Sequence, residues 1–228
     1  MKIFNKKRVG FTLAEVLVTL GIIGVVAVLT VPNVISSYQK KVYVAQLQKA
    51  YNQISNAVAL LMIDEEVDNL NDSSLFCNDN DSDYNDCTLN SSEQFLKKYF
   101  KIAKDCGDDS ENKNCVAEQY KRIDGEAAYI PNSLVSKYAV SLNTGATFIV
   151  HPFDTGRPMQ VFVDINGKKK PNTYGRDAFY FGVNYRGDIA ESFPMESEFN
   201  DPARCAEQQP YSGGCFSKII DEGWKMDY

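Results

Sequence analysis

Residues 1–31 of this chain read MKIFNKKRVGFTLAEVLVTLGIIGVVAVLTV, and they decide how the rest of the sequence is organised. The first ten residues carry four basic side chains and no acidic one, whereas residues 11–31 form an apolar run with a single charge, Glu15. As a helix this run would be about 31 Å long, which matches the hydrocarbon core of a bilayer. The basic leader predicts a cytoplasmic N-terminus, so the residues after the run are expected outside the cytoplasm.

The apolar run is unlike a conventional secretory signal, which has a shorter apolar stretch and a small-residue cleavage site after it. Here the run continues directly into Pro32 without such a site. Cleavage after the run is therefore not expected. Hydropathy and charge alone leave an uncleaved single-pass anchor as the simplest interpretation.

The string GFTLAEVLVTL, from Gly10 to Leu20, resembles the processing and methylation signal of type IV prepilins and type II secretion pseudopilins. The leader, the glycine, the phenylalanine, the offset of the glutamate and the apolar length all agree with that signal. The resemblance implies that a membrane-embedded prepilin peptidase cuts between Gly10 and Phe11 and methylates the new amino group of Phe11. It also implies that Pro32 lies where many such proteins have a helix-kinking proline.

Glu15 has a physical role under this resemblance. A carboxylate is costly at the centre of a bilayer, but Glu15 would lie only about 6 Å along the helix axis from the cut end and can stay near the headgroups. In a filament, the resemblance implies that its carboxylate meets the amine of a neighbouring Phe11. Glu15 would then set the axial register, because a misplaced subunit leaves a buried charge unpaired.

Past Pro32, apolar side chains recur at alternating spacings of three and four, which predicts an amphipathic helix to about residue 66. They are Val44, Leu47, Tyr51, Ile54, Val58 and Leu61. Ser91 is expected to cap a short second helix, with Gln94 completing the motif. From Lys137 onward, aromatic and β-branched runs separated by turns predict an antiparallel sheet.

These signals predict an α+β protein with the pilin fold, in which a long N-terminal helix packs on an antiparallel β-sheet head with disulfide-held loops. The expected parts are a leader at residues 1–10, the N-terminal helix at 11–66 and an extracytoplasmic globular head at 67–228. Within the helix, residues 11–31 would form the transmembrane segment or filament core, and residues 32–66 the amphipathic half.

The six cysteines fall into three close pairs in polar, turn-rich sequence: Cys77 and Cys87, Cys106 and Cys115, and Cys205 and Cys215. No C-x-x-C motif is present and the chain has one histidine, so the pattern does not favour zinc. Sequence allows about fifteen connectivities, of which the local one needs the least long-range organisation. Disulfides persist in an oxidising compartment, which agrees with an exported head, whereas reduced, exposed thiols are the alternative.

Residues 163–177, VDINGKKKPNTYGRD, gather four oxygen-bearing side chains: Asp164, Asn166, Asn172 and Asp177. The segment is similar to β-region loops of pseudopilins, and in the major subunits such a region is associated with calcium. Calcium takes six to eight oxygen ligands, which these side chains and backbone carbonyls could supply. The alternative is a plain hairpin, because Asn-Gly and Pro-Asn are ordinary turn formers.

Charge and motifs restrict the function. The formal net charge is −6, and because the leader carries four cations, the chain from Phe11 onward carries −10. No nucleic-acid partner is expected, since such binding requires a basic patch that the sequence does not show clearly. Nor does the sequence support an enzyme: its one histidine, His151, precedes a proline, and no nucleophile elbow, phosphate loop or metal triad is present.

The sequence therefore predicts a structural subunit of a type II secretion pseudopilus or a type IV pilus-like filament, polymerised through its N-terminal helix and requiring no cofactor. The expected partners are prepilin peptidase, copies of itself and other pilin-like subunits, and an inner-membrane assembly platform. The expected location is the cytoplasmic membrane, in a single pass with an extracytoplasmic head, and then a periplasmic or cell-surface filament. The alternative is a monomeric, membrane-anchored extracytoplasmic binding module.

Overall fold

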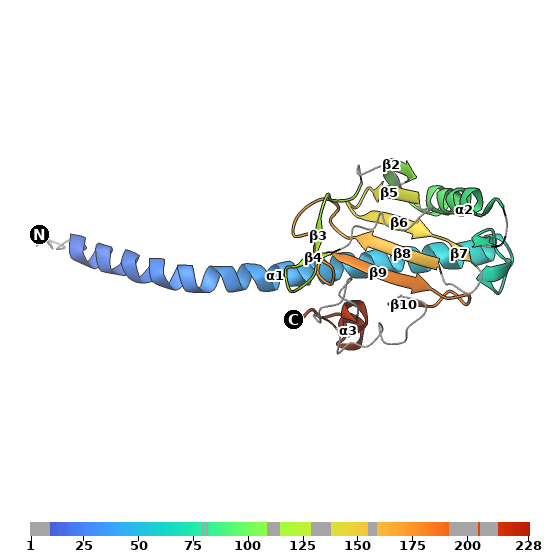
Figure 1. Ribbon diagram of the computed structural model, residues 1–228. Coiled ribbons are helices and arrows are strands. Elements are labelled where there is room, and N and C mark those ends of the chain that lie inside the picture. Colours follow the sequence, from blue (N-terminus) through green and yellow to red (C-terminus); the bar gives the residue numbers. More distant parts are fainter. Residues whose placement is uncertain are drawn as a thin grey trace, which may run out of the picture. The chain divides into compact units, whose positions relative to one another are not determined.

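The computed structural model describes residues 10–78, 80, 82–108, 115–128, 138–154, 159–191, 205 and 214–228. The chain divides into two compact units, Met1–Lys40 and Lys41–Tyr228, and each is described by itself. Helix α1 (Leu13–Asp64) contributes to both units (Figure 1). Pro32 lies inside this helix.

In the first unit, the apolar side chains of α1 are exposed all around the helix. Leu17, Ile22 and Val25 are 60–63% exposed. The most apolar stretch of the helix is 18 residues long, and none of it is buried. By length and composition, this part of α1 can cross a membrane.

In the second unit, α1 buries one face against the head. The buried residues on this face are Val44, Leu47, Ala50, Ile54, Ala57, Val58 and Leu61. The predicted stripe is confirmed, with one difference: Tyr51 is half-buried and packs against the rings of Phe216 and Trp224, with centroids 6.1 and 5.5 Å away. The helix ends at Asp64, two residues before the predicted end.

The head is built on a six-stranded antiparallel sheet in the order β10-β9-β8-β6-β5-β2 (Figure 1). Its strands are β2 (Ile102–Asp108), β5 (Tyr138–Leu142), β6 (Thr147–His151), β8 (Met159–Asp164), β9 (Ala178–Val183) and β10 (Ile189–Glu191). The predicted antiparallel sheet is confirmed. Glycine at position 145 closes the β5–β6 turn with φ +88° and donates its N–H to the Leu142 carbonyl, as a tight hairpin requires.

Both faces of the sheet are covered, and the register separates them into two rows. Val140, Phe148, Val163 and Phe179 are cross-strand neighbours in the main core, which also contains the buried face of α1. The alternate row, Ala139, Ile149, Phe162 and Tyr180, lies in a second cluster with Tyr120 and Tyr174. Because both faces are buried, every residue of β9 is apolar or glycine and buried.

The remaining elements lie around the sheet. They are the 3-10 helix η1 (Leu70–Asp72), β1 (Phe76–Cys77), α2 (Tyr84–Tyr99), β3 (Tyr120–Lys121), β4 (Ala127–Ala128), β7 (Phe153–Asp154) and α3 (Cys215–Asp221). The prediction that α2 starts near Ser91 is wrong, since the helix begins seven residues earlier. Ser92 is instead buried inside the helix and donates to the Val150 carbonyl at 3.2 Å, so packing on β6 overrides the local capping signal.

Candidate functional site

The backbone from Gly10 to Thr12 is not helical, and α1 begins at Leu13. The Phe11 side chain is 88% exposed. The Cβ position of Gly10 has no neighbouring atom within 4 Å. In the described part of the chain, the bond between Gly10 and Phe11 therefore lies outside helical structure and uncovered.

Glu15 and Thr12 form a reciprocal cap at the start of α1. The Thr12 backbone N–H and hydroxyl both donate to Glu15 Oε2 at 2.8 Å, and the Glu15 N–H donates to Thr12 Oγ1 at 3.2 Å. This is the capping box that a T-x-x-E pattern predicts, a signal already visible in the sequence but not used. In the single chain, the Glu15 carboxylate thus has a partner within its own helix.

Pro32 is placed by the structure in the interior of α1, with helix on both sides. A proline there has no N–H to donate to the carbonyl one turn earlier. The bend of the helix that the sequence predicts at Pro32 stays a prediction.

The six cysteines form three disulfides, which join the pairs of the local connectivity. The Cα atoms of Cys77 and Cys87 are 5.9 Å apart, those of Cys106 and Cys115 6.1 Å, and those of Cys205 and Cys215 4.4 Å. Each separation is within the range that a disulfide can span. Cys77 lies in β1, Cys87 in α2, Cys106 in the edge strand β2 of the sheet, and Cys215 at the start of α3. Each bridge therefore ties an element of the head to a segment nearby in the sequence.

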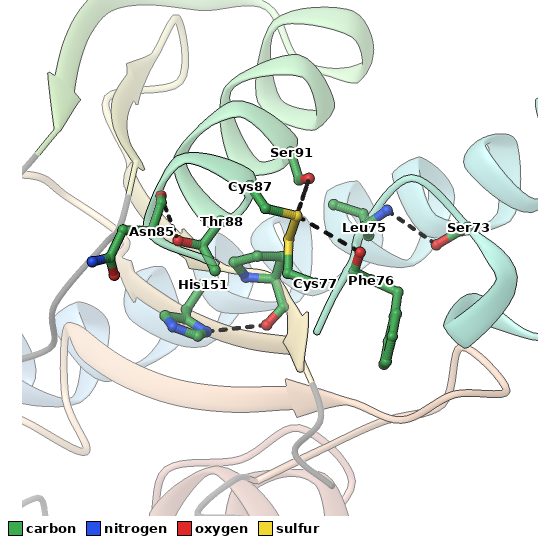
Figure 2. Close-up of a disulfide and its surroundings, with 10 residues drawn as sticks. Ser73, Leu75, Phe76, Cys77, Asn85, Cys87, Thr88, Ser91 and His151 are labelled. Carbon is green, nitrogen blue, oxygen red and sulfur yellow. Dashed lines mark hydrogen bonds between the residues drawn. A yellow bond between two sulfur atoms is a disulfide. The ribbon is translucent and has the colours of Figure 1, made fainter. Parts of the chain in front are cut away.

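Figure 2 shows the first of these disulfides, which ties β1 to the first turn of α2. Ser91 lies beside the bridge, with its hydroxyl 3.6 Å from Cys77 Sγ. His151 lies nearby at the end of β6, as the sequence predicts, and its Nδ1 is 3.0 Å from the Pro152 carbonyl oxygen. The bridge therefore fixes the end of the head at which β1, β6 and α2 meet.

The loop between β8 and β9 brings the four predicted residues into one hydrogen-bonded network, in which Asn172 takes part through its backbone N–H. Asn166 Nδ2 and the Asn172 N–H donate to Asp177 Oδ2 at 3.0 and 2.9 Å. The Asn166 N–H donates to Asp164 Oδ1 at 3.2 Å. The Tyr120 hydroxyl, from β3, donates to Asp164 Oδ2 at 2.8 Å.

Burial dominates the electrostatics of the two aspartates. It raises the pKa of Asp164 to about 8, although the hydrogen bond from Tyr120 opposes the shift. Burial also raises the pKa of Asp177, against the backbone N–H groups of Thr173 and Asn172 that favour the charged form. The loop thus holds two carboxyl groups that resist ionisation.

Two acceptors of the same loop have no partner: Asn166 Oδ1 and Asn172 Oδ1 are buried without a hydrogen bond. Such orphaned oxygens are uncommon in folded proteins. Among the described residues there is no cluster of three or more His, Cys, Asp or Glu side chains that could hold a metal. A cation at this loop would therefore depend on amide and carbonyl oxygens together with the two aspartates.

The described molecule is an α+β protein with a membrane-compatible N-terminal helix and a disulfide-bonded antiparallel head, which is consistent with a pilin-like fold. Residues 5–31 match the family described as the prokaryotic N-terminal methylation motif. The chain thus carries the prepilin-type signal of type IV pilin-like proteins. Neither the curated proteins nor the solved structures gave a match to this chain.

Proposed function

We propose that this protein is a structural subunit of a type II secretion pseudopilus or a type IV pilus-like filament. In this proposal, prepilin peptidase cuts between Gly10 and Phe11 and methylates Phe11. Subunits then polymerise through the N-terminal helix on an inner-membrane assembly platform, together with other pilin-like subunits. The observation that carries the proposal is the prepilin-type signal at residues 5–31, which includes an apolar helical segment whose side chains are exposed.

The exposed segment of α1 supports the proposal because its apolar surface must be covered. Lipid can cover it in the precursor, and helices of neighbouring subunits can cover it after polymerisation. Small residues at Ala14, Gly21 and Gly24 allow close approach of helices, since no atom fills the space beside either glycine. The three disulfides support a head in an oxidising, extracytoplasmic compartment.

Glu15 is proposed to exchange partners during assembly. In the single chain its carboxylate accepts from Thr12, and in the filament it would accept from the Phe11 amine of a neighbour. The capping box keeps the carboxylate satisfied until a charged partner arrives. Glu15 would then set the axial register, because only one offset brings the two charges together.

Mass spectrometry of the protein purified from membranes tests processing. The proposal expects a chain that begins at N-methylated Phe11 and lacks the ten leader residues. A 25.6 kDa chain with intact Met1, in cells that contain prepilin peptidase, would contradict it and favour the monomeric anchored binding module.

Assembly is tested separately with Glu15→Gln, which keeps the capping acceptor and removes the charge. We expect processed subunits that do not enter sheared filaments. The matched control is Glu65→Gln, an isosteric change at an acid of the head, which should assemble normally. Normal assembly of Glu15→Gln would contradict the register role while leaving processing intact.

We also propose that the loop from Asp164 to Asp177 binds calcium as a structural ion. Its support is chemical: two buried carboxyl groups and two orphaned amide oxygens lie in one loop, and oxygen is the ligand that calcium prefers. Calcium should raise the melting temperature of the full chain in detergent and EGTA should reverse the rise. Asp177→Asn should abolish the response, and an identical response in that variant would contradict the proposal.

A further inference from the structure

A cavity that is open to solvent lies in the head where β3 meets the loop between β8 and β9. Its volume is about 550 Å³, within the range of sites for small molecules. One wall is the segment from Ala117 to Lys121, and the other is the segment from Lys168 to Asn172. The cavity therefore joins two parts of the chain that are far apart in sequence.

The two walls are fixed to each other through their backbones. The Lys121 N–H donates to the Asn172 carbonyl and the Tyr174 N–H donates to the Lys121 carbonyl, both at 2.9 Å. Beneath them, the Tyr120 and Tyr174 rings are fully buried and contact each other with centroids 5.6 Å apart. The walls thus have a defined spacing before any ligand arrives, which lowers the ordering cost of binding.

The lining is basic in an acidic protein. Among the described residues, three ammonium groups, from Lys121, Lys168 and Lys170, line the cavity with one carboxylate, Glu118. Within the described residues, no carboxylate forms an ion pair with Lys121 or Lys170. This local concentration of positive charge, in a chain of net charge −6, favours an anionic ligand.

The uncharged and acidic members of the lining narrow the class of anion. The Glu118 carboxylate and the Gln119 amide can accept hydrogen bonds from hydroxyl groups. A carboxylate would repel a continuous polyphosphate backbone, and among the described residues the lining contains no aromatic ring on which a nucleobase could stack. Hydroxyl groups beside an acidic group are the chemistry of an acidic sugar.

We propose that this cavity binds an anionic sugar, with a carboxylate or phosphate held by Lys121, Lys168 and Lys170 and hydroxyl groups held by Glu118 and Gln119. The ligand would be a unit of an acidic glycan or a phosphorylated sugar. This site goes beyond a purely structural subunit, because it gives the head a binding activity that does not require polymerisation.

The test measures binding of glucuronate, glucose 6-phosphate and glucose to the full chain in detergent, by calorimetry at low salt with EGTA present. We expect both anionic sugars to bind and to weaken as salt rises, and glucose not to bind. The two anionic probes distinguish a carboxylate source from a phosphate source. Tighter binding of a short single-stranded DNA than of either sugar would overturn the sugar assignment.

The matched variants have equal charge changes. The triple variant K121Q/K168Q/K170Q should bind about tenfold more weakly or worse. The control triple K49Q/K101Q/K104Q changes three exposed lysines that do not line the cavity, and it should bind normally. Within the loop, K170Q should weaken binding more than K169Q, since Lys169 is not part of the lining.

Equal affinities for the two triple variants would overturn the proposal, because the effect would then reflect net charge alone. Melting temperatures near that of the wild type must accompany the comparison. All measurements are made on single chains in detergent, so failure to polymerise leaves this result unchanged, and absence of binding leaves the filament proposal unchanged.

Discussion

The two parts of helix α1 have the same backbone and opposite surroundings. In the first unit, Leu17 and Ile23 are 61% and 62% exposed, whereas in the second unit Leu47 and Ile54 are 0% exposed. The first part is apolar all around, and the second has one apolar stripe. A helix with a single stripe needs one partner surface, whereas a helix that is apolar all around needs an apolar environment. The same helix therefore serves as the packing spine of the head and as a segment whose partners are outside the chain.

The largest effect should come from making the same substitution in both parts. Leu47→Ala removes a fully buried side chain from the main core and should lower the free energy of unfolding of the head by about 2–5 kcal/mol. Leu17→Ala removes no contact within the head and should leave that free energy unchanged. Urea unfolding can be followed by the fluorescence of Trp224, the one tryptophan of the chain. Its ring packs against the ring of Tyr51 in α1, with the two centroids 5.5 Å apart.

Equal unfolding free energies for the two variants would contradict the division of α1. Leu17→Ala should show its effect elsewhere, as weaker retention in the membrane or a lower yield of filaments. A Leu17→Ile variant, which keeps the apolar volume, is the control for that second measurement.

Sequence predicted the parts of the fold that depend on local patterns. The exposed and buried parts of α1, the strands β5, β6, β8 and β9, and the processing signal all follow from periodicity, turns and a short motif. Strand β2 was missed because its sequence, IAKDCGD, is largely exposed and its pairing with β5 contains two register irregularities. No local sequence pattern specifies β2 as a strand. Its strand conformation depends on pairing with β5.

The candidate sites divide in the same way. The capping box of Thr12 and Glu15 was readable from four residues. The segment that contains Lys168 and Lys170 was predicted as a calcium-binding loop or a plain hairpin. The sequence could not bring Lys121 beside it, because the bridge from Lys121 to Thr173 joins segments about fifty residues apart. The basic cavity exists only because of that long-range pairing. The acidic composition of the chain gave no sign of such a cavity and argued against an anionic ligand.

The second effect concerns the Cys77–Cys87 disulfide, which lies in the unit that contains the spine. A Cys77→Ser/Cys87→Ser variant should lose about 2–3 kcal/mol of head stability, since the bridge closes a loop of ten residues. Hydrogen exchange should accelerate in α2 and in residues 54–64 of α1, and remain unchanged in residues 13–30. Ser91→Ala, beside the same bridge, is the control (Figure 2). Faster exchange in residues 13–30 would show that the two parts of the helix are coupled.

The third effect extends the comparison from apolar to acidic side chains. Burial raises the pKa of Asp164 to about 8, above the value of about 3.9 in an unfolded chain. Between these values the folded state holds a proton that the unfolded state has lost, so the stabilisation contributed by Asp164 is fully present below about pH 4 and is lost as pH rises toward 8. The fall should be about 1 kcal/mol between about pH 6 and 7, measured by urea unfolding in EGTA.

Asp164→Asn should flatten this dependence, because the amide does not titrate. The exposed Asp72→Asn is the control and should retain it. A slope of the same size in both variants would mean that another group of the head is responsible.

The smallest effect lies at the start of α1, where polar contacts hold the first turn. Thr12→Ala removes the hydroxyl that accepts from the Glu15 N–H, whereas Thr12→Ser keeps it. In the precursor, amide exchange at residues 13–16 should accelerate a few-fold in Thr12→Ala and not in Thr12→Ser, and the melting temperature of the head should be unchanged in both. If Thr12→Ala leaves exchange unchanged, lipid alone holds the first turn, and Glu15 needs no partner within its own helix before assembly. If exchange accelerates, Glu15 is held by Thr12 in the monomer, and a neighbouring amine must compete with that contact to recruit the carboxylate.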